Sequence, residues 1–431
     1  MARGSMGRRS RAPGLAARDD RNRNGRRGEI ASVALVSEHA SPLAQPGGPD
    51  AGGQNVYVAA LAAELARRGI STTVFTRRDS RALPPRAPLT HGATLEHLDA
   101  GPPEPLSRDA LAPYMSVFAR ELETAWRREP PDVVHAHYWM SGLAAARAAR
   151  GRGIPIVQTF HALGVVKRRV QGKVDTSPAE RIAAETHLAR TVDAVAATSY
   201  GELRQLALMG AVPRRSGVIP CGVDTRLFCP DGPTEPRMGR RRLVAVGRLV
   251  PRKGVDDVVR ALRHLPGIEL IVAGGRAGVD ADRERLRALA HAVGVGDRVE
   301  LRGPVLHASL PRLMRSADLV VCVPWYEPFG IVALEAMACG RPVVASAVDG
   351  LVETIVDGRT GVLVPPRNSR MLAQTVGALL ADDEQRHRLG DEARRRVERD
   401  YDWRRVIDLM LELYAEARAR RPRPARGDGS A

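Results

Sequence analysis

The chain has 431 residues, of which 44% are hydrophobic and 27% charged, so it can form two globular domains of roughly 150–200 residues each. No segment approaches the roughly 18–20 consecutive apolar residues of a membrane span, and the N-terminal region contains no apolar segment typical of a secretory signal. The four cysteines form neither a C-x-x-C pair nor a metal-ligand spacing with histidine, which indicates free thiols in a reducing cytoplasm.

The formal net charge of +17 is located mainly at the two ends of the chain. Residues 1–28 contain nine Arg and two Asp, and residues 417–431 contain five Arg and one Asp. Both ends are rich in Arg, Gly, Pro and Ala, a composition that predicts disordered tails over 1–28 and 418–431. Because the body carries little excess charge and only 4% of the residues are aromatic, no nucleic-acid partner is expected.

Between the tails, short runs of Val, Ile, Ala and Leu alternate with amphipathic helical patterns. In one such pattern, residues 55–68, the side chains of Val58, Leu61 and Leu65 share one face, and Gly69 ends the helix. Near-continuous apolar strands that alternate with helices predict an α/β fold with parallel sheets covered on both faces. The expected strands are 32–37, 72–76, 132–136, 154–160 and 194–198, followed by 217–219, 243–247, 268–273, 318–323 and 342–346.

About ten strands are too many for one such unit, so the sequence predicts two Rossmann-like, doubly wound domains that face each other across a cleft. A Pro-containing segment at 222–240 separates them, which places the domains at 29–222 and 223–402. Ligands of open parallel sheets bind beyond the carboxyl ends of the strands. The chemistry is therefore expected in the loops that follow strands.

The first strand leads into a long loop, Ser41 to Tyr57, in which Gly52 and Gly53 precede a helix. Bare glycine backbone at a helix start allows an anion to approach closely. The loop lacks the Gly-x-Gly-x-x-Gly pattern of dinucleotide-binding sites, so a dehydrogenase is disfavoured. Loops of this length in compact domains are more often functional than plain connections.

Histidines gather at the ends of two neighbouring strands. His135 and His137 precede Tyr138 at the end of one strand, and His161 ends the next. This grouping indicates that at least one of the three lies in a functional site. No His-x-x-x-His pattern on a helix is present, so the histidines are not expected to bind a metal.

Two cations, Arg248 and Lys253, lie in a proline-containing turn that follows a strand of the second half. A pair of cations beside a helix start can balance the charge of a leaving diphosphate, which otherwise requires a divalent metal. Asp280 and Asp282 form an Asp-x-Asp pattern, but they open a highly charged helical segment and are interpreted as a solvated face. A metal-dependent transferase is therefore disfavoured.

The segment Glu327-Pro-Phe-Gly-Ile-Val-Ala-Leu-Glu335 carries two carboxylates eight positions apart. Its Pro-Phe-Gly turn leads into a helix, whose first N–H groups suit a phosphate. A carboxylate on either side of that helix start suits a ligand rich in hydroxyls. A nucleotide sugar, with its diphosphate between ribose and hexose, meets both requirements, so the segment predicts a sugar-transferring enzyme.

Together these motifs resemble those of the retaining, two-domain (GT-B) glycosyltransferases of family 4. The similar branch contains the mycothiol-pathway inositol-phosphate N-acetylglucosaminyltransferases and the sucrose-phosphate synthases. The resemblance covers about residues 30–415 and implies that the last helix, 403–417, crosses back to the first domain. The motifs that carry it are Ser41 to Tyr57, His135-Ala-His-Tyr-Trp139, Gly247-Arg-Leu to Lys253-Gly254, and Glu327 to Glu335.

The resemblance implies a role for each donor residue. Arg248 and Lys253 would hold the diphosphate, and Glu335 would take the ribose hydroxyls. Glu327 would bind a hydroxyl of the donor sugar, whose outer edge would face His161. The implied catalytic residues are His161, Arg248, Lys253 and Glu327, and the implied donor-binding residues are Gly52, Gly53, Arg248, Lys253, Phe329, Gly330, Ile331, Val332 and Glu335.

For the acceptor, the resemblance implies a phosphate grip by Arg108, Tyr138 and Arg181, with Asn55 as a further contact. Two positions depart from the inositol-phosphate pattern: Ala162 replaces a threonine, and Val305 replaces a base-contacting arginine. The expected reaction is transfer of a glucosyl or N-acetylglucosaminyl group from a nucleotide-diphosphate sugar to a small soluble acceptor such as inositol phosphate or a sugar phosphate. Retention would follow from same-face substitution, without an essential metal or other cofactor.

Other functions stay open from the sequence. The acceptor could be a specialised metabolite or a thiol. A membrane-associated mannosyltransferase could act on a lipid acceptor through the basic and apolar surface at Val165–Val170. A non-catalytic protein could bind the nucleotide sugar alone, and a homodimer also stays open. We expect a cytoplasmic protein that binds a nucleotide sugar and a small acceptor, with neither nucleic acid nor membrane as a partner.

Overall fold

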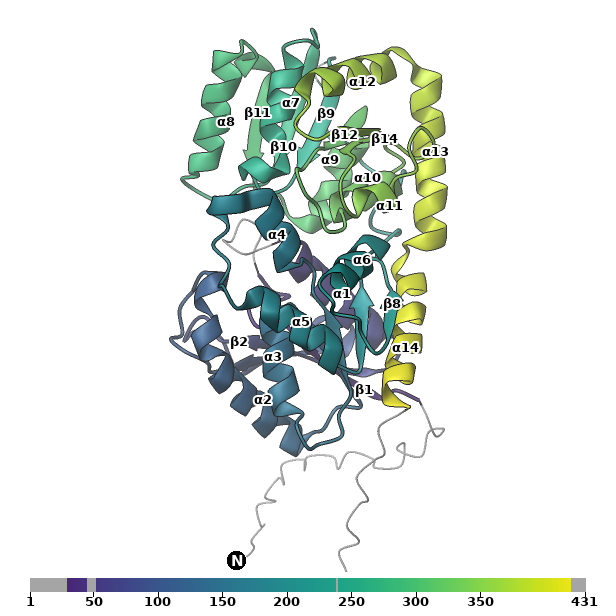
Figure 1. Ribbon diagram of the computed structural model, residues 1–431. Coiled ribbons are helices and arrows are strands. Elements are labelled where there is room, and N and C mark those ends of the chain that lie inside the picture. Colours follow the sequence, from purple (N-terminus) through teal and green to yellow (C-terminus); the bar gives the residue numbers. More distant parts are fainter. Residues whose placement is uncertain (1–28, 45–51, 238, 420–431) are drawn as a thin grey trace, which may run out of the picture.

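The structure is a computed structural model that describes residues 29–44, 52–237 and 239–419. Figure 1 shows two α/β domains, one above the other, with the last two helices running along one side of both. Each domain is a mostly parallel sheet with helices packed against it. The predicted pair of Rossmann-like, doubly wound domains is confirmed. The Arg-rich tails expected at 1–28 and 418–431 lie outside the described residues except for Arg418 and Ala419, and Arg418 is the last residue of the final helix.

The first domain contains an eight-stranded sheet in the order β3-β4-β2-β1-β5-β6-β7-β8. All neighbouring strands are parallel except β3, which pairs with β4 in the antiparallel direction. The strands are β1 Ser32–Val36, β2 Ser71–Arg77, β3 Arg86–Pro88, β4 Thr94–Leu98, β5 Val133–His137, β6 Ile156–Thr159, β7 Ala194–Ala197 and β8 Ser216–Val218. The strand expected at 217–219 is therefore β8 and closes this first sheet.

The helices of the first domain bury one apolar face against the sheet. In α1, which spans Gly53–Arg67, the side chains of Tyr57, Val58, Leu61 and Leu65 are buried, as the helical spacing of these residues predicts. The remaining helices are α2 Met115–Arg128, α3 Trp139–Ala148, α4 Gly164–Gln171, α5 Arg181–Thr191 and α6 Tyr200–Leu208.

The second domain contains a six-stranded parallel sheet in the order β11-β10-β9-β12-β13-β14. The strands are β9 Arg241–Val246, β10 Ile268–Ala273, β11 Val299–Gly303, β12 Leu319–Cys322, β13 Val343–Ser346 and β14 Val362–Val364. The helices are α7 Val255–Leu262, α8 Ala281–Ala292, α9 Leu310–Arg315, α10 Ile331–Ala338, α11 Leu351–Thr354, α12 Ser369–Ala381 and α13 Asp383–Asp400.

The last helix, α14, spans Trp403–Arg418 and crosses back to the first domain, as expected (Figure 1). The hydroxyl of Tyr414 lies 2.7 Å from Nδ1 of His135, and Arg418 forms an ion pair of 2.9 Å with Asp132. At the start of this crossing, the backbone N–H of Val223 donates to the carbonyl of Tyr401 at 2.9 Å. The two chain segments that connect the domains therefore lie side by side and form the hinge between them.

Four strands were not predicted: β3, β4, β11 and β14. Strand β4 has the sequence Thr-Leu-Glu-His-Leu, and its Glu96 and His97 are nevertheless buried. Strand β14 has only three residues, and β3 and β11 are edge strands. β3, β4 and β11 contain polar residues, and the apolar run of β14 is only three residues long, so none has the longer apolar run that indicates a central parallel strand.

Candidate active site

The predicted site residues follow strands at the point where each sheet changes direction. In the first sheet β1 lies between β2 and β5, and in the second sheet β9 lies between β10 and β12. The loop after β1 leads to Gly53, the loop after β9 carries Arg248 and Lys253, and the loop after β12 carries Glu327. Crevices at such switch points are the usual ligand sites of open parallel sheets.

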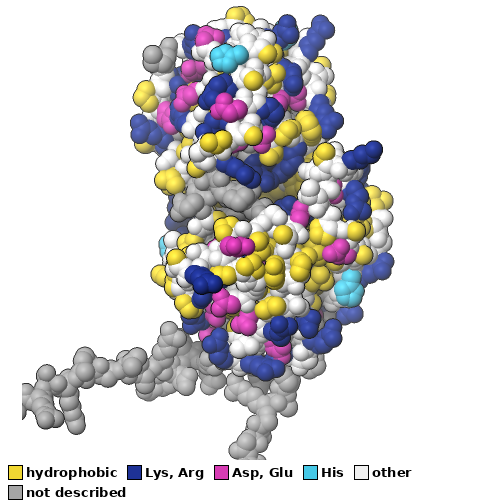
Figure 2. Space-filling view, turned by 90° about the vertical axis from the view of Figure 1, so that its left-hand side faces the viewer, with side chains coloured by type: hydrophobic (Ala, Val, Ile, Leu, Met, Phe, Trp, Pro, Cys, Tyr) yellow, Lys and Arg dark blue, Asp and Glu magenta, His cyan; other side chains and the backbone are white. Residues whose placement is uncertain are grey.

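The starts of α1 and α10 face each other across the two domains. A Cβ atom placed on Gly53 would lie 3.3 Å from Cδ1 of Ile331. Figure 2 shows Lys and Arg side chains along the lower border of the upper domain, next to the junction of the domains. The two sets of predicted donor residues therefore share one interdomain site.

Lys253 and Glu327 form an ion pair in this site, although they lie 74 positions apart. Both side chains are mostly buried, with 23% of Lys253 and 14% of Glu327 exposed. Lys253 ends a short 3₁₀ turn, and the following Gly254 has a φ of 73° that favours glycine. A Cβ on Gly254 would lie 1.9 Å from the carbonyl oxygen of Val323, so only glycine brings these two loops so close.

The start of α10 offers backbone N–H groups to an anion. Gly330 precedes the helix with a φ of 95°, and a Cβ there would lie 2.5 Å from Leu351. Within the described structure no side chain caps this helix start, and its first turn contains no acidic residue. Phe329 is buried and anchors the turn, while Ile331 and Val332 are partly exposed. This arrangement suits the phosphate of a ligand.

Glu335 is buried in the second turn of α10 and binds a partner that the sequence did not indicate. Its Oε1 lies 2.6 Å from Nε2 of His307, which follows β11. Burial lowers the pKa of His307, but the hydrogen bond and the charge of Glu335 outweigh burial, so the pKa is raised overall. A lone histidine in a polar loop, 28 positions from its carboxylate, gives no sequence signal.

The three histidines lie together in the first domain. Nδ1 of His137 is 3.0 Å from Nε2 of His161, and the rings of His135 and His137 have centroids 4.2 Å apart. Burial lowers the pKa of His135 and of His161 to about 3, and it lowers the pKa of His137 well below its usual value. The cluster is therefore neutral at physiological pH. His161 is partly exposed and has a φ of 59°.

Tyr138 lies between two of the predicted acceptor residues. The guanidinium carbon of Arg181 is 4.9 Å from the centre of the Tyr138 ring, and that of Arg108 is 5.3 Å away. Tyr138 is only 2% exposed, and its hydroxyl has no hydrogen-bond partner among the described residues. Arg181 also forms a buried ion pair of 2.7 Å with Glu185 and donates to the carbonyl of Ala162. The structure thus brings Arg108, Tyr138 and Arg181 together.

Asn55 organises the end of the loop before α1. Its Oδ1 accepts a hydrogen bond from the N–H of Gly52, and its Nδ2 donates to the carbonyl of Ser41, both at 2.9 Å. These bonds give the side chain a local structural role. Its contact with an acceptor stays a prediction.

The interpretation of Asp280 as a solvated residue is wrong. Asp280 is 7% exposed and caps the N-terminus of α8, because its carboxylate accepts hydrogen bonds from the N–H groups of Asp282, Arg283 and Arg276. Within residues 29–44, 52–237 and 239–419, no group of three or more His, Cys, Asp or Glu side chains could hold a metal ion. The four cysteines are free thiols. None of the described helices is long and apolar enough to cross a membrane.

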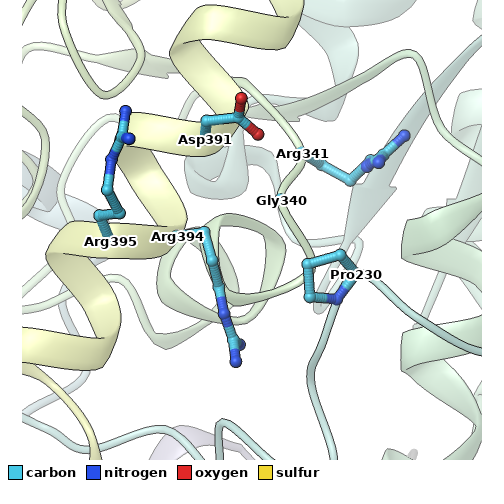
Figure 3. A pocket seen from close by; sticks show the side chains of 6 residues that line it. All are labelled: Pro230, Gly340, Arg341, Asp391, Arg394 and Arg395. Atoms are coloured by element: carbon cyan, nitrogen blue, oxygen red, sulfur yellow. The ribbon is translucent and has the colours of Figure 1, made fainter.

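A cavity of about 290 Å³ lies away from this site, between the linker and α13 (Figure 3). The guanidinium groups that line it point in different directions in Figure 3. The guanidinium group of Arg394 donates hydrogen bonds to the carbonyls of Phe228 and Ala338, at 2.8 and 2.7 Å. The cavity is therefore part of the hinge packing. Its lining residues are Pro230, Gly340, Arg341, Asp391, Arg394 and Arg395.

Comparison with known proteins agrees with this geometry. Residues 51–227 match the family "Glycosyltransferase Family 4", and residues 232–396 match "Glycosyl transferases group 1". The D-inositol 3-phosphate glycosyltransferase of Xylanimonas cellulosilytica is 40% identical over 408 residues, which cover 90% of this chain and 98% of that protein.

Two solved structures share the fold. Sucrose-phosphate synthase from Thermosynechococcus elongatus aligns with a TM-score of 0.83 and 32% identity, covering 89% of this chain and 98% of that one. Anabaena HepE in complex with UDP and glucose aligns with a TM-score of 0.69 and 22% identity, also over 89% of this chain and 98% of that one. The chain is therefore a glycosyltransferase and belongs to family 4, with the two-domain GT-B fold.

Proposed function

We propose that this enzyme transfers a glucosyl or N-acetylglucosaminyl group, with retention of configuration, from a nucleotide-diphosphate sugar to a small phosphorylated acceptor. The acceptor is of the inositol phosphate or sugar phosphate class. The observation that carries the proposal is the grouping of Arg108 and Arg181 over the ring of Tyr138, whose buried hydroxyl has no hydrogen-bond partner among the described residues.

A buried hydroxyl without a partner is costly, and two adjacent cations favour an anion as the missing partner. The guanidinium of Arg108 can bind a phosphate with paired hydrogen bonds, and the Tyr138 hydroxyl can donate to a third oxygen. Arg181 already donates to Glu185, Ser177 and the carbonyl of Ala162, and would add its remaining N–H groups. The name of the relative from Xylanimonas cellulosilytica, a D-inositol 3-phosphate glycosyltransferase, supports an acceptor of this class. Ala162 in place of the expected threonine leaves the identity of the phosphorylated acceptor to experiment.

The donor diphosphate is assigned to the start of α10, and Lys253 and Arg248 of the loop after β9 would balance its charge. The N–H groups at Ile331 and Val332 and the charge of Lys253 would stabilise the departing diphosphate. Glu335, buried below them, would take the ribose hydroxyls in place of its hydrogen bond with His307. HepE, which shares the fold, is described in complex with UDP and glucose, and this supports UDP as the first nucleotide to test.

Same-face substitution follows from the carboxylates available. A double-displacement mechanism needs a free carboxylate nucleophile at the reacting carbon. Glu327 is instead paired with Lys253, and its backbone N–H donates to Asp349 at 3.1 Å, so we assign its carboxylate the role of orienting a sugar hydroxyl. The leaving phosphate would accept the proton of the incoming hydroxyl. The protein contributes positioning and charge stabilisation, with no metal.

The test begins with thermal-shift screening against UDP-, GDP-, ADP- and TDP-linked glucose and N-acetylglucosamine. The donor that stabilises the protein most is then incubated with inositol phosphates, sugar phosphates, their dephosphorylated forms and a low-molecular-weight thiol. Mass spectrometry of the products should show one hexosyl unit added to a phosphorylated acceptor. Transfer to the thiol or the dephosphorylated acceptors alone would contradict the proposal.

A further inference from the structure

Glu353 bridges the two domains by capping a helix that belongs to the other one. Glu353 lies in α11 of the second domain, and α6 of the first domain begins at Tyr200. The Glu353 carboxylate accepts two hydrogen bonds. Oε2 accepts one from the N–H of Tyr200 at 2.9 Å, and Oε1 accepts one from the N–H of Gly201 at 2.7 Å. These N–H groups have no partner within the helix itself, and a carboxylate is the acceptor that a helix N-terminus favours.

A residue of the first domain also caps the N-terminus of α6. The hydroxyl of Ser199 accepts the N–H of Glu202 at 3.1 Å, as an ordinary N-cap does. The first turn of α6 is therefore capped once from within its domain and twice from the opposite domain. If the domains separate, the two hydrogen bonds to the carboxylate break, and water must replace the lost partner of each group.

Glu353 is held firmly on its own side. Its carbonyl accepts a hydrogen bond from Nη2 of Arg396 at 2.9 Å, and the carbonyl of Thr354 accepts one from Nε at 3.0 Å. The guanidinium of Arg396 also lies 5.5 Å from the centre of the Tyr401 ring, at the hinge. The carboxylate therefore projects from a fixed segment, and little ordering is needed to form the bridge.

The same segment supports the donor loop. The N–H of Gly350 donates to the carbonyl of Glu327 at 3.2 Å, and the carboxylate of Asp349 accepts the N–H of Glu327. A Cβ on Gly350 would lie 2.3 Å from the carbonyl oxygen of Pro328, so the two segments are in direct backbone contact. The side chain of Leu351 packs against Gly330, where a Cβ would lie 2.5 Å from Cδ2 of Leu351. Residues 349–354 thus connect the donor loop directly with the first domain.

We propose that Glu353 is a positioning residue for the transfer reaction, which holds the domains closed and so places the Glu327 loop against the acceptor domain. The inference rests on the donor position given under the proposed function. Closure of two domains around a donor excludes water and completes the site. Glu353 touches neither substrate and acts through the backbone of residues 327–330.

The first test is hydrogen exchange of the peptide that covers residues 198–208, measured with and without UDP. In the wild type, UDP should slow exchange at Tyr200 and Gly201 because closure is favoured. In Glu353→Ala and Glu353→Gln, exchange there should be fast in both states. Small-angle scattering should show a more open molecule for both variants. Glu412→Gln, an exposed carboxylate on α14, is the matched control and should behave as the wild type.

The second test separates positioning from stability. Both Glu353 variants should lose about tenfold or more in kcat/KM, the effect of losing charged hydrogen bonds. The melting temperature should change little, whereas the dissociation constant for UDP should rise by a smaller factor than kcat/KM falls, because UDP binding and domain closure favour each other. Unchanged exchange at residues 198–208, or a kcat/KM that falls only in proportion to the melting temperature, would overturn the inference. If no donor is turned over at all, the proposed function fails, but exchange and scattering still decide the role of Glu353.

Discussion

The ion pair of Lys253 with Glu327 joins the loop after β9 to the loop after β12, at the switch point of the second sheet. A cation and a carboxylate thus stand beside the free N–H groups of α10. Such a site can hold a diphosphate with the cation while the carboxylate takes a sugar hydroxyl. This relationship links the fold to the chemistry of the donor.

Replacing Lys253 by Ala should lower kcat by about 10²–10³-fold, the loss typical of a group that stabilises charge in the transition state. The variant also leaves Glu327 without its cation. Steady-state kinetics with the best donor and acceptor measure the effect. Lys173→Ala, which removes an exposed lysine, serves as the control and should keep full activity. A Lys253 variant with unchanged turnover would refute the assignment.

Replacing Tyr138 by Phe should separate acceptor binding from stability. The hydroxyl has no partner among the described residues, so its removal should leave the melting temperature unchanged or higher. The KM for a phosphorylated acceptor should rise about tenfold or more, because a hydrogen bond to a charged group is lost. Initial rates over a range of acceptor concentrations, with a dephosphorylated acceptor alongside, give the comparison. A lower melting temperature with an unchanged KM would show that the hydroxyl has a structural role instead.

His137 should fix the tautomer of His161. If Nε2 of His161 were the donor, the buried Nε2 of His137 would carry a proton without a partner, which is the costlier arrangement. His161 is therefore expected to keep its proton on Nδ1 and to present a donor to the sugar.

His137→Phe should release this control and lower kcat/KM about tenfold. The ¹⁵N shifts of selectively labelled His161 report the tautomer directly in both proteins. His264→Asn, at an exposed position, is the matched control. Equal ¹⁵N shifts in the wild type and the His137 variant would contradict this role.

Glu202 should make the stability of the protein depend on pH. Burial raises its pKa from 4.5 to about 7, although two hydrogen bonds from Thr198 oppose the shift. The folded form therefore binds the proton more tightly than the unfolded chain does. The resulting stabilisation is complete below the unfolded pKa of 4.5 and is lost as the pH rises through about 7.

Glu202→Gln removes this titration and preserves the shape of the side chain. Melting temperatures should be similar for both proteins at pH 4.5, and the wild type should fall below the variant at pH 8. Circular dichroism or differential scanning fluorimetry provides the measurement. If the melting temperatures of the wild type and the variant change with pH in the same way, the Glu202 carboxyl has the same pKa in the folded and the unfolded state.

Removal of divalent metal should leave the transfer rate unchanged. The proposed site balances the diphosphate with Lys253, Arg248 and the N-terminus of α10, so no ion is required. Dialysis against EDTA followed by an assay in metal-free buffer provides the measurement. Activity that disappears and returns with Mg²⁺ or Mn²⁺ would contradict the proposed mechanism.

Local patterns made the fold predictable, together with the strand-end positions of the candidate donor residues. The apolar central strands, the glycines before α1 and α10, and the segment from Glu327 to Glu335 are all readable within a short window of sequence. The mutual arrangement of Lys253 and Glu327 follows from topology, since parallel strands present their loops at one edge. These parts could therefore be placed before the structure was known.

Other features depend on partners that lie far apart in the chain. His307 pairs with Glu335 across 28 positions, and Glu353 caps a helix about 150 positions earlier in the other domain. Strand β4 is buried although it contains Glu96 and His97, because it lies between β3 and β2 and packs against α2. Asp280 lies in a highly charged segment of the sequence, but in the structure it caps the N-terminus of α8. No local pattern indicates such contacts.

The most direct test of the account is the NMR spectrum of the product made from an α-linked UDP-hexose and an inositol or sugar phosphate. We predict one new sugar linked to the phosphorylated acceptor, with the anomeric coupling of an α-glycoside, which shows transfer with retention. A β-linked product, or no transfer to any phosphorylated acceptor while another acceptor is used, would contradict it.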